Sequence, residues 1–233
     1  MQKHKVWLCQ NYLDRLSGMM TVSEPIAQKY SACFGIAVPN AAPYQHLTPK
    51  RVKPDQVKLT YHGIGNRARG IEVLLDAMAL LSPSFQLNLL LMINAKSMRT
   101  LVHQAASLPN VRFLEPVLKS KIPNAVNEFD VGVYAMQPRT FNERFALPNK
   151  FFENVQARLA QVVTPTSEMQ NLIVRHEIGM VAEGFNAVSF ATAVGTLNSQ
   201  LIDEMKFATN KAAITLSWEN FAPRISQLIN GLI

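Results

Sequence analysis

The chain has 233 residues, of which 48% are hydrophobic and 17% are charged, and its formal net charge is +7. This composition excludes an intrinsically disordered chain and predicts a globular fold with a substantial core. The two cysteines, Cys9 and Cys33, have neither CxxC spacing nor a paired histidine. We therefore expect no disulfide framework and no metal site, and a reducing, cytoplasmic compartment.

The positive charge fits an anionic partner, for which nucleic acid, an acidic lipid surface and a nucleotide phosphate all qualify. The basic residues form no run, and their densest group is Lys50, Arg51 and Lys53. A solvated surface therefore explains the charge equally well. The longest apolar stretch, 87–93, is interrupted by Asn88 and is far shorter than a membrane span. We expect a soluble protein that can rest on a membrane surface.

The front of the chain contains short elements that are too few to bury a core of their own. In order, we expect a helix at 6–17, a strand at 18–22, a helix from Ser23 to about Phe34 and a strand at 36–38. These elements are typical of the last units of a preceding domain whose beginning lies outside this chain. We assign 1–45 to this remnant and 46–56 to a proline-containing linker.

After the linker, apolar runs alternate regularly with helical patterns. The expected strands lie near 57–62, 86–92, 111–114, 130–135, 161–164 and 178–182. The expected helices lie near 70–82, 96–107, 119–128, 149–158, 167–175 and 187–197. This alternation predicts an α/β fold with a doubly wound parallel sheet, which we assign to 57–212. An amphipathic helix at 213–233 is expected to end the chain.

The segment 147–153, Leu-Pro-Asn-Lys-Phe-Phe-Glu, follows the strand expected near 130–135. Asn149 is a candidate N-cap of the next helix, which places Lys150 at a helix N-terminus that already favours an anion. Glu153 lies one turn further on and can accept two hydrogen bonds from a sugar diol. This combination predicts a nucleotide-diphosphate site. The alternative is a Lys–Glu pair on a solvated helix face.

The loop 62–70 connects an expected strand to an expected helix. Gly63 and Gly65 permit close backbone approach, and Arg67 or Arg69 would attract phosphate. The loop does not match the dinucleotide fingerprint, because the position of the third glycine holds alanine. A tight turn between strand and helix is the alternative interpretation.

A third candidate, 164–168, follows the fifth strand of the expected sheet. Thr166 and Ser167 would offer a phosphate their backbone N–H groups, although an ordinary N-cap at Ser167 is the favoured interpretation. The five histidines show no metal-ligand spacing. His62, at a strand end, is the one histidine that is a site candidate, and a structural role explains it equally well.

Together these segments resemble the C-terminal, nucleotide-sugar-binding half of a GT-B glycosyltransferase of the group 1 (family 4) class. The motifs that carry the resemblance are Arg-Gly-Ile-Glu at 69–72, Pro-Asn-Lys-x-x-Glu at 148–153, the helix led by Ser-Glu at 167–168, and Gly179. At the front, 21–24 and 38–41 resemble the end of the acceptor-side domain and the crossover into the donor domain. The resemblance covers nearly the whole chain.

The resemblance implies a role for each matching residue. It assigns to nucleotide-sugar binding Gly63, Gly65, Arg67, Asn149, Glu153, Thr166 and Ser167, and to catalysis Arg69, Lys150 and Glu143. It implies that Glu153 holds the ribose hydroxyls, and that Lys150 with an arginine binds the diphosphate and stabilises the leaving group. It also implies transfer with retention of configuration, without a metal or other cofactor.

Two departures from the family pattern bear on activity. The family's first glutamate lies eight residues before Glu153, where this chain has Phe145, and Glu143 is two residues away from that position. The usual Gly-x-Pro turn before the fifth strand is Arg-Leu-Ala at 158–160. Because the family's active site lies between two domains, we expect this chain alone to be a poor catalyst.

We therefore predict a hexosyltransferase-type glycosyltransferase whose partners are a nucleotide sugar and a glycan or lipid-linked acceptor in polysaccharide or cell-envelope synthesis. We expect it in the cytoplasm, with peripheral contact to anionic lipid at the inner face of the membrane. The second hypothesis is a degenerate, non-catalytic module that binds a nucleotide or a partner protein. A nucleic-acid binder has only the charge in its favour, and we expect no nucleic-acid partner.

Overall fold

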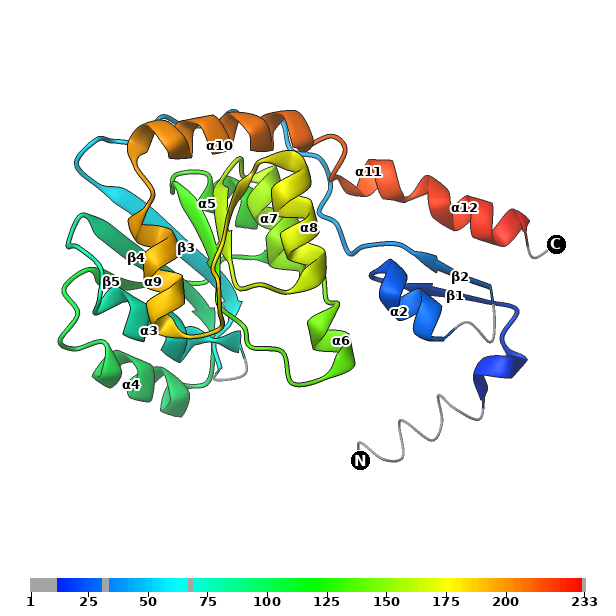
Figure 1. Cartoon of the computed structure of the whole chain (residues 1–233), viewed down its shortest axis with the longest axis horizontal. Helices are drawn as coiled ribbons and strands as arrows, with labels where there is room; N and C mark the ends of the chain where they lie inside the picture. Colours follow the sequence, from blue (N-terminus) through cyan, green and yellow to red (C-terminus); the bar gives the residue numbers. More distant parts are fainter. Residues whose placement is uncertain (1–11, 31–33, 67–68, 232–233) are drawn as a thin grey trace.

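A parallel sheet forms the centre of the larger part of the molecule (Figure 1). Its strands lie in the order β5-β4-β3-β6-β7-β8. The computed structural model describes residues 12–30, 34–66 and 69–231. The strands are β3 (Val57–Ile64), β4 (Phe85–Met92), β5 (Val111–Leu114), β6 (Val131–Tyr134), β7 (Ala160–Val163) and β8 (Gly179–Val181). All five neighbouring pairs are parallel. The predicted doubly wound parallel sheet is confirmed.

Helices connect these strands and cover the sheet. They are α3 (Ile71–Met78), α4 (Ala95–Gln104), α5 (Ile122–Val126), α7 (Asn149–Gln156), α8 (Ser167–His176), α9 (Ala187–Gly195) and α10 (Ser199–Ala212). Helix α3 packs against α9, and α5 packs against α7. The central strands are buried on both faces; β6 and β7 have no exposed residue. This covering explains why the strands read as continuous apolar runs in the sequence.

The chain reverses its direction across the sheet between β3 and β6. These strands are neighbours, yet the chain leaves β3 towards β4 and leaves β6 towards β7. In open parallel sheets such a switch point opens a crevice at the carboxyl ends of the strands. Gly70 closes the packing there, because its φ is +75° and a Cβ would overlap the carbonyl of Ala135, just after β6. The start of α3 is therefore held against the end of β6.

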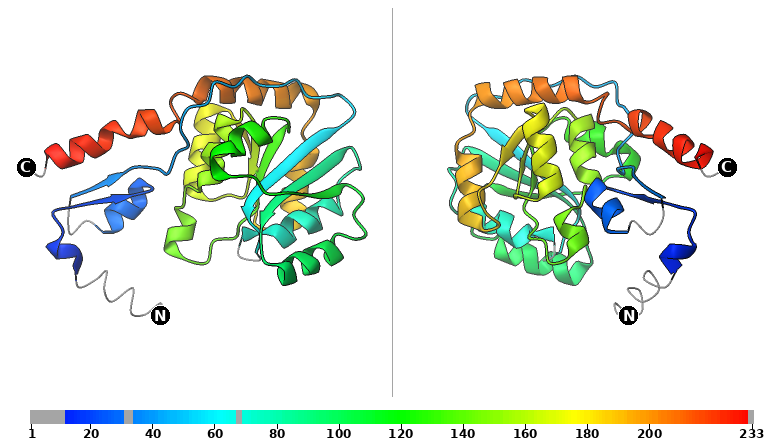
Figure 2. Two further views of the ribbon diagram at one scale, coloured as in Figure 1. Left: turned by 180° about the vertical axis from the view of Figure 1, so that it is seen from behind. Right: turned by 45° about the vertical axis from the view of Figure 1, so that its right-hand side comes forward.

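The front of the chain forms a small separate sheet. Strands β1 (Gly18–Thr21) and β2 (Phe34–Ala37) pair in parallel, and α2 (Glu24–Lys29) packs against both. This unit lies beside the C-terminal helices α11 (Trp218–Phe221) and α12 (Pro223–Asn230), as the views in Figure 1 and Figure 2 show. The guanidinium of Arg224 donates to the Ala37 carbonyl over 3.2 Å, and Trp218 N donates to the Ala42 carbonyl over 3.0 Å.

The structure differs from the expected elements in several places. Of the helix expected at 6–17, residues 6–11 lie outside the described residues, and a 3-10 turn, η1, spans Leu13–Arg15. The helix expected at 119–128 is a 3-10 turn, η3 (Lys119–Lys121), followed by α5. The single C-terminal helix is two helices, since Pro223 lacks an N–H and starts a new one.

Arg158 ties the segment just before the linker to the main domain. Its φ is +62°, so it takes the left-handed conformation that a glycine would adopt more readily. The guanidinium is buried and donates to the carbonyls of Gln45 and Gln156 over 2.6 Å each, and to Asn210 Oδ1 over 2.8 Å. Its Cζ lies 5.2 Å from the ring centroid of Tyr44. One side chain therefore joins this front segment, α7 and α10.

We predict that Arg158→Met lowers the free energy of unfolding by roughly 2–4 kcal/mol, because it leaves several buried carbonyl groups without a donor. Urea unfolding followed by circular dichroism measures the change. Arg51→Met is the matched control: the Arg51 side chain is 93% exposed in its ion pair with Asp203, and its loss should change stability by less than about 0.5 kcal/mol. A loss in Arg158→Met no larger than in this control would contradict the prediction.

Candidate functional site

A cavity of about 330 Å³ opens at the carboxyl end of β3. Its walls come from the ends of β3 and β4, the segment before α5 and the first turn of α7. A second cavity of about 570 Å³ lies next to it, against the segment 40–45 that precedes the linker, and shares Lys119, Asn149 and Glu153 with the first. Both volumes fall within the range of small-molecule sites. The first cavity lies at the end of β3, one of the two strands that meet at the switch point of the sheet.

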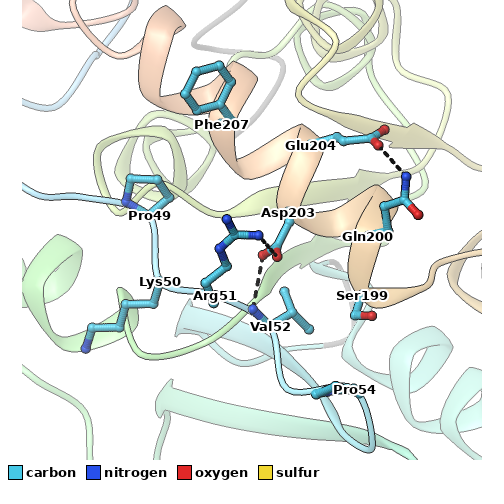
Figure 3. Close-up of a pocket in the computed structure, with 10 residues that line it drawn as sticks. All are labelled: Pro49, Lys50, Arg51, Val52, Pro54, Ser199, Gln200, Asp203, Glu204 and Phe207. Carbon is cyan, nitrogen blue, oxygen red and sulfur yellow. Dashed lines mark hydrogen bonds and ion pairs between the residues drawn. The ribbon is translucent and has the colours of Figure 1, made fainter.

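A larger cavity, about 740 Å³, lies elsewhere, between the linker and α10 (Figure 3). Three of its charged groups already have partners within its wall: Asp203 accepts from Arg51 Nη1 over 3.3 Å and from Val52 N over 3.1 Å, and Glu204 accepts from Gln200 over 3.0 Å. Of the predicted site residues that the structure describes, none lines it. We therefore take the cavity at the switch point as the functional site, because ligands of parallel sheets bind at the carboxyl ends of the strands.

Lys150 places a half-buried basic side chain in this cavity. Its Nζ donates to the Tyr61 hydroxyl over 3.0 Å and lies 4.4 Å and 4.8 Å from the ring centroids of Tyr61 and Tyr134. The two rings are stacked, with an interplanar angle of 5°. Burial, and then the positive charge of Arg69, lower the pKa of the Lys150 amine from 10.5 to about 7. An anion in the cavity would offset both effects.

Arg69 adds a second cation to the same cavity. Its Nη1 donates to the Tyr134 hydroxyl over 3.4 Å, so both basic groups contact the tyrosine pair. Gly63 faces them with a φ of +102°, and a Cβ at this position would lie 3.9 Å from Lys150 Nζ. Backbone therefore comes close to the ammonium without a side chain between them. Two cations beside an open backbone position suit a phosphate group.

Glu153 lies one turn after Lys150 and lines both cavities. It is 6% exposed, and burial raises the pKa of its carboxyl, an effect that the charges of Lys119 and Lys150 oppose. Its Oε2 lies 3.6 Å from His62 Nδ1. Burial and the charge of Lys150 lower the pKa of His62 to about 3, so this contact joins a carboxyl group to a neutral ring and is not an ion pair.

The cavity brings together five of the residues predicted for the site, namely Gly63, Arg69, Asn149, Lys150 and Glu153. The prediction that Asn149 caps α7 is wrong: Pro148 is the N-cap and Asn149 is the first helical residue. Arg67 lies outside the described residues. Gly65 packs away from the cavity, and a Cβ there would lie 2.9 Å from Leu91 Cδ1.

The other three predicted residues lie apart from this cavity. Glu143 accepts from Arg139 N over 2.7 Å and caps α6 (Phe141–Arg144) in a capping box with Thr140. Ser167 is not the cap of α8 as predicted; it follows the N-cap Thr166, and its hydroxyl donates to the Arg144 carbonyl over 3.4 Å. The Thr166 hydroxyl is buried and has no hydrogen-bond partner among the described residues.

Sequence reasoning missed Tyr61, Tyr134 and Lys119. The two tyrosines occur near the ends of neighbouring buried strands, and a buried tyrosine hydroxyl needs a polar partner. That signal was present in the sequence, but the adjacency of β3 and β6 was needed to use it. No sequence motif includes Lys119, and only the fold brings it to the wall of the cavity.

Among the described residues, no helix is long and apolar enough to cross a membrane. Within the same residues, no group of three or more His, Cys, Asp or Glu side chains is placed to hold a metal ion.

Solved structures with the same architecture include glycosyltransferases. Sucrose-phosphate synthase from Thermosynechococcus elongatus is 17% identical, with a TM-score of 0.78 over 99% of this chain and 62% of that chain. HepE from Anabaena, solved with UDP-glucose, is 14% identical, with a TM-score of 0.75 over 95% of this chain and 66% of that chain. WaaG, involved in lipopolysaccharide biosynthesis, is 14% identical, with a TM-score of 0.68 over 91% of this chain and 62% of that chain. This chain therefore spans less than two thirds of the length of these relatives.

Residues 56–200 match the family of glycosyl transferases group 1. The chain belongs to this family, as the sequence motifs indicated. No curated protein matches the sequence.

We predict that the charge of Lys150 destabilises the unliganded protein in a pH-dependent way. Because its folded-state pKa of about 7 is lower than the ordinary value of 10.5, the unfolded chain binds more protons between these values, and stability rises with pH there. Lys150→Met should therefore exceed the wild type in unfolding free energy most at pH 6, and the difference should shrink towards pH 9.

Urea unfolding at pH 6, 7, 8 and 9 measures this difference, with Lys96→Met, an exposed position on α4, as the matched surface control. A difference between Lys150→Met and the wild type that stays constant over this range would show that the amine keeps an ordinary pKa.

Proposed function

We propose that this chain binds a nucleotide-diphosphate sugar and that, in a complete two-domain form, it transfers the sugar to an acceptor with retention of configuration. The observation that carries the proposal is the convergence of Lys150, Arg69 and Glu153 on one cavity at the switch point of the sheet. The family membership and the fold support a glycosyltransferase. Retention rests on the resemblance of the motifs.

In the proposed site, Lys150 and Arg69 bind the diphosphate and stabilise the negative charge that develops on the departing nucleotide. Glu153 accepts hydrogen bonds from the ribose hydroxyls. Gly63 and Asn149 lie next to these groups and bring backbone close to the donor. We propose that transfer uses no metal or other cofactor, as the resemblance implies. Thr166, Ser167 and Glu143 stay predicted site residues, although they lie apart from this cavity.

For the acceptor, we propose a glycan or a lipid-linked sugar in polysaccharide or cell-envelope synthesis. The net charge of +7 supports peripheral contact with anionic lipid at the cytoplasmic face of a membrane. The solved relatives include a lipopolysaccharide glycosyltransferase, which fits this class of acceptor.

The second candidate function is a nucleotide-binding module without transferase activity. Phe145 stands where the family's sugar-contacting glutamate is expected. Its ring packs against that of Phe141, with 4.7 Å between the ring centroids. The nearby Glu143 uses its carboxylate to cap α6. Both observations favour a site that keeps nucleotide binding and has lost sugar handling.

We predict that one or more of UDP, GDP, ADP and dTDP raises the melting temperature, by roughly 5–10 °C at a hundredfold excess over the dissociation constant. Glu153→Ala should reduce this shift, because a ribose-binding carboxylate is lost, while Glu128→Ala, an exposed residue after α5, should not. Differential scanning fluorimetry, referenced to each variant's own unliganded midpoint, measures the shift. No stabilisation by any of the four nucleotides would sink the donor-site proposal.

Phe145→Glu separates the two candidate functions. With the nucleotide sugar whose diphosphate binds best, a degenerate module should show no donor hydrolysis, and Phe145→Glu should introduce slow hydrolysis without weakening diphosphate binding. Release of the free nucleotide, followed by chromatography, is the measurement, and Phe145→Gln is the control without a carboxylate. Donor hydrolysis by the wild type itself would exclude the second candidate function, a module without catalytic activity.

A further inference from the structure

A chain of buried polar side chains lies directly behind Glu153. His62 Nε2 is 3.2 Å from Asn154 Oδ1, and Asn154 Nδ2 is 3.5 Å from Gln161 Oε1. These three side chains are 2–3% exposed and join β3, α7 and β7. Asn154 fits because residue 132 is glycine: a Cβ at that position would overlap the Asn154 amide. The packing is therefore arranged around this polar chain.

The contacts of Asn154 indicate which nitrogen of His62 carries the proton. Asn154 directs its NH₂ group to the Gln161 oxygen over 3.5 Å, so its own oxygen faces the ring. An amide oxygen can only accept, and with this orientation of the amide Nε2 carries the hydrogen. Burial and the charge of Lys150 keep the ring neutral, with a pKa of about 3. His62 consequently has a proton on Nε2 and a free lone pair on Nδ1.

That lone pair faces the candidate site. His62 lines the cavity, and its Nδ1 lies 3.6 Å from Glu153 Oε2, which is longer than a hydrogen bond. In the described part of the chain, no group donates a hydrogen bond to Nδ1. Two acceptors, one on β3 and one on α7, therefore stand side by side in the cavity wall. A ligand that suits them must bring two neighbouring donors.

We propose that His62 Nδ1 and the Glu153 carboxylate together bind the vicinal diol of the nucleotide's ribose, one hydroxyl donating to each. This inference rests on the proposed function, and it adds His62 as a binding residue beside Glu153. The two ribose hydroxyls stand on adjacent carbons and each supplies one donor, which matches an adjacent pair of acceptors. Asn154 and Gln161 act as positioning residues, because they keep the Nδ1 lone pair directed at the diol.

The alternative arrangement places the proton on Nδ1, where it would hold Glu153 by an internal hydrogen bond. Such a ring would need the amides of Asn154 and Gln161 turned over together, so that Asn154 Nδ2 donates to Nε2 and Gln161 Nε2, which has no partner among the described residues in the present orientation, donates to Asn154 Oδ1. With Asn154 in its present orientation, two acceptors would face each other at 3.2 Å in a buried position, which is destabilising. The ¹⁵N measurement on the wild type distinguishes the two arrangements, because only the proton on Nε2 leaves Nδ1 unprotonated.

The test compares UDP, GDP and ADP with their 2′,3′-dideoxy counterparts, called the deoxy forms below because they lack both hydroxyls of the diol, by isothermal titration calorimetry. The wild type should bind the ribose form of the preferred nucleotide more tightly than the deoxy form. His62→Phe should reduce this ratio by about fivefold, the value of one hydrogen bond, while the affinity for the deoxy form stays unchanged. His62→Gln keeps an acceptor oxygen and should recover part of the ratio.

A buried control separates the loss of an acceptor from a general loss of stability. Thr209, remote from the cavity, donates to the carbonyls of Leu159 and Met205 and is fully buried. Thr209→Val should lower the melting temperature and leave the ribose-to-deoxyribose ratio unchanged. A wild-type ratio in His62→Phe would overturn the role of His62 alone. No binding of any nucleotide by the wild type would instead overturn the proposed function, and the diol pair with it.

A measurement on the wild type covers the case in which His62→Phe does not fold. The ¹⁵N chemical shifts of the His62 ring should show an unprotonated Nδ1 in the free protein. Nδ1 should shift on addition of the preferred ribonucleoside diphosphate, and less with its deoxy form. A protonated Nδ1 in the free protein would overturn the proposal.

Discussion

The close packing around β6 is the constraint on which the site depends. Gly132, inside this strand, leaves room for the amide of Asn154, and Gly70, at the start of α3, lies against the carbonyl of Ala135. The first contact brings α7 onto the sheet, and the second brings the start of α3 to the end of β6. Lys150, Glu153 and Arg69 reach one cavity because both approaches are unobstructed. A side chain at either glycine would separate the cations from each other or from the carboxylate.

Charge in this cavity is arranged for a ligand more than for stability. The Lys150 amine is buried against Tyr61 and Tyr134, and a second cation lies nearby. Burial of like charges destabilises the unliganded protein, and a bound diphosphate would reverse that effect. On the other side, Glu153 and His62 offer acceptors only. The site thus divides into a part that demands negative charge and a part that demands hydrogen-bond donors.

The segment just before the linker is part of the same arrangement. Arg158 stands where the family's usual turn has glycine, and its guanidinium holds the carbonyl of Gln45 against α7. Residues 40–43 line the second cavity together with Glu153. Lys29 of the front unit lies 3.9 Å from the ring centroid of Phe141 on α6. The front of the chain therefore contacts the main domain both at the second cavity and at α6.

The sequence by itself determined the α/β class, the order of strands and helices, and the Lys150–Glu153 turn at the carboxyl edge, because these follow from local periodicity and from motifs within one segment. It did not determine that Glu143 caps α6 or that Pro148, not Asn149, caps α7. Such choices depend on competition among nearby hydrogen-bond partners, which the fold decides. The tyrosine pair beside Lys150 joins β3 to β6, and the polar chain of His62, Asn154 and Gln161 joins β3, α7 and β7. Only the tertiary structure decided these contacts, since burial and the identity of a side chain's partners are properties of the packed molecule.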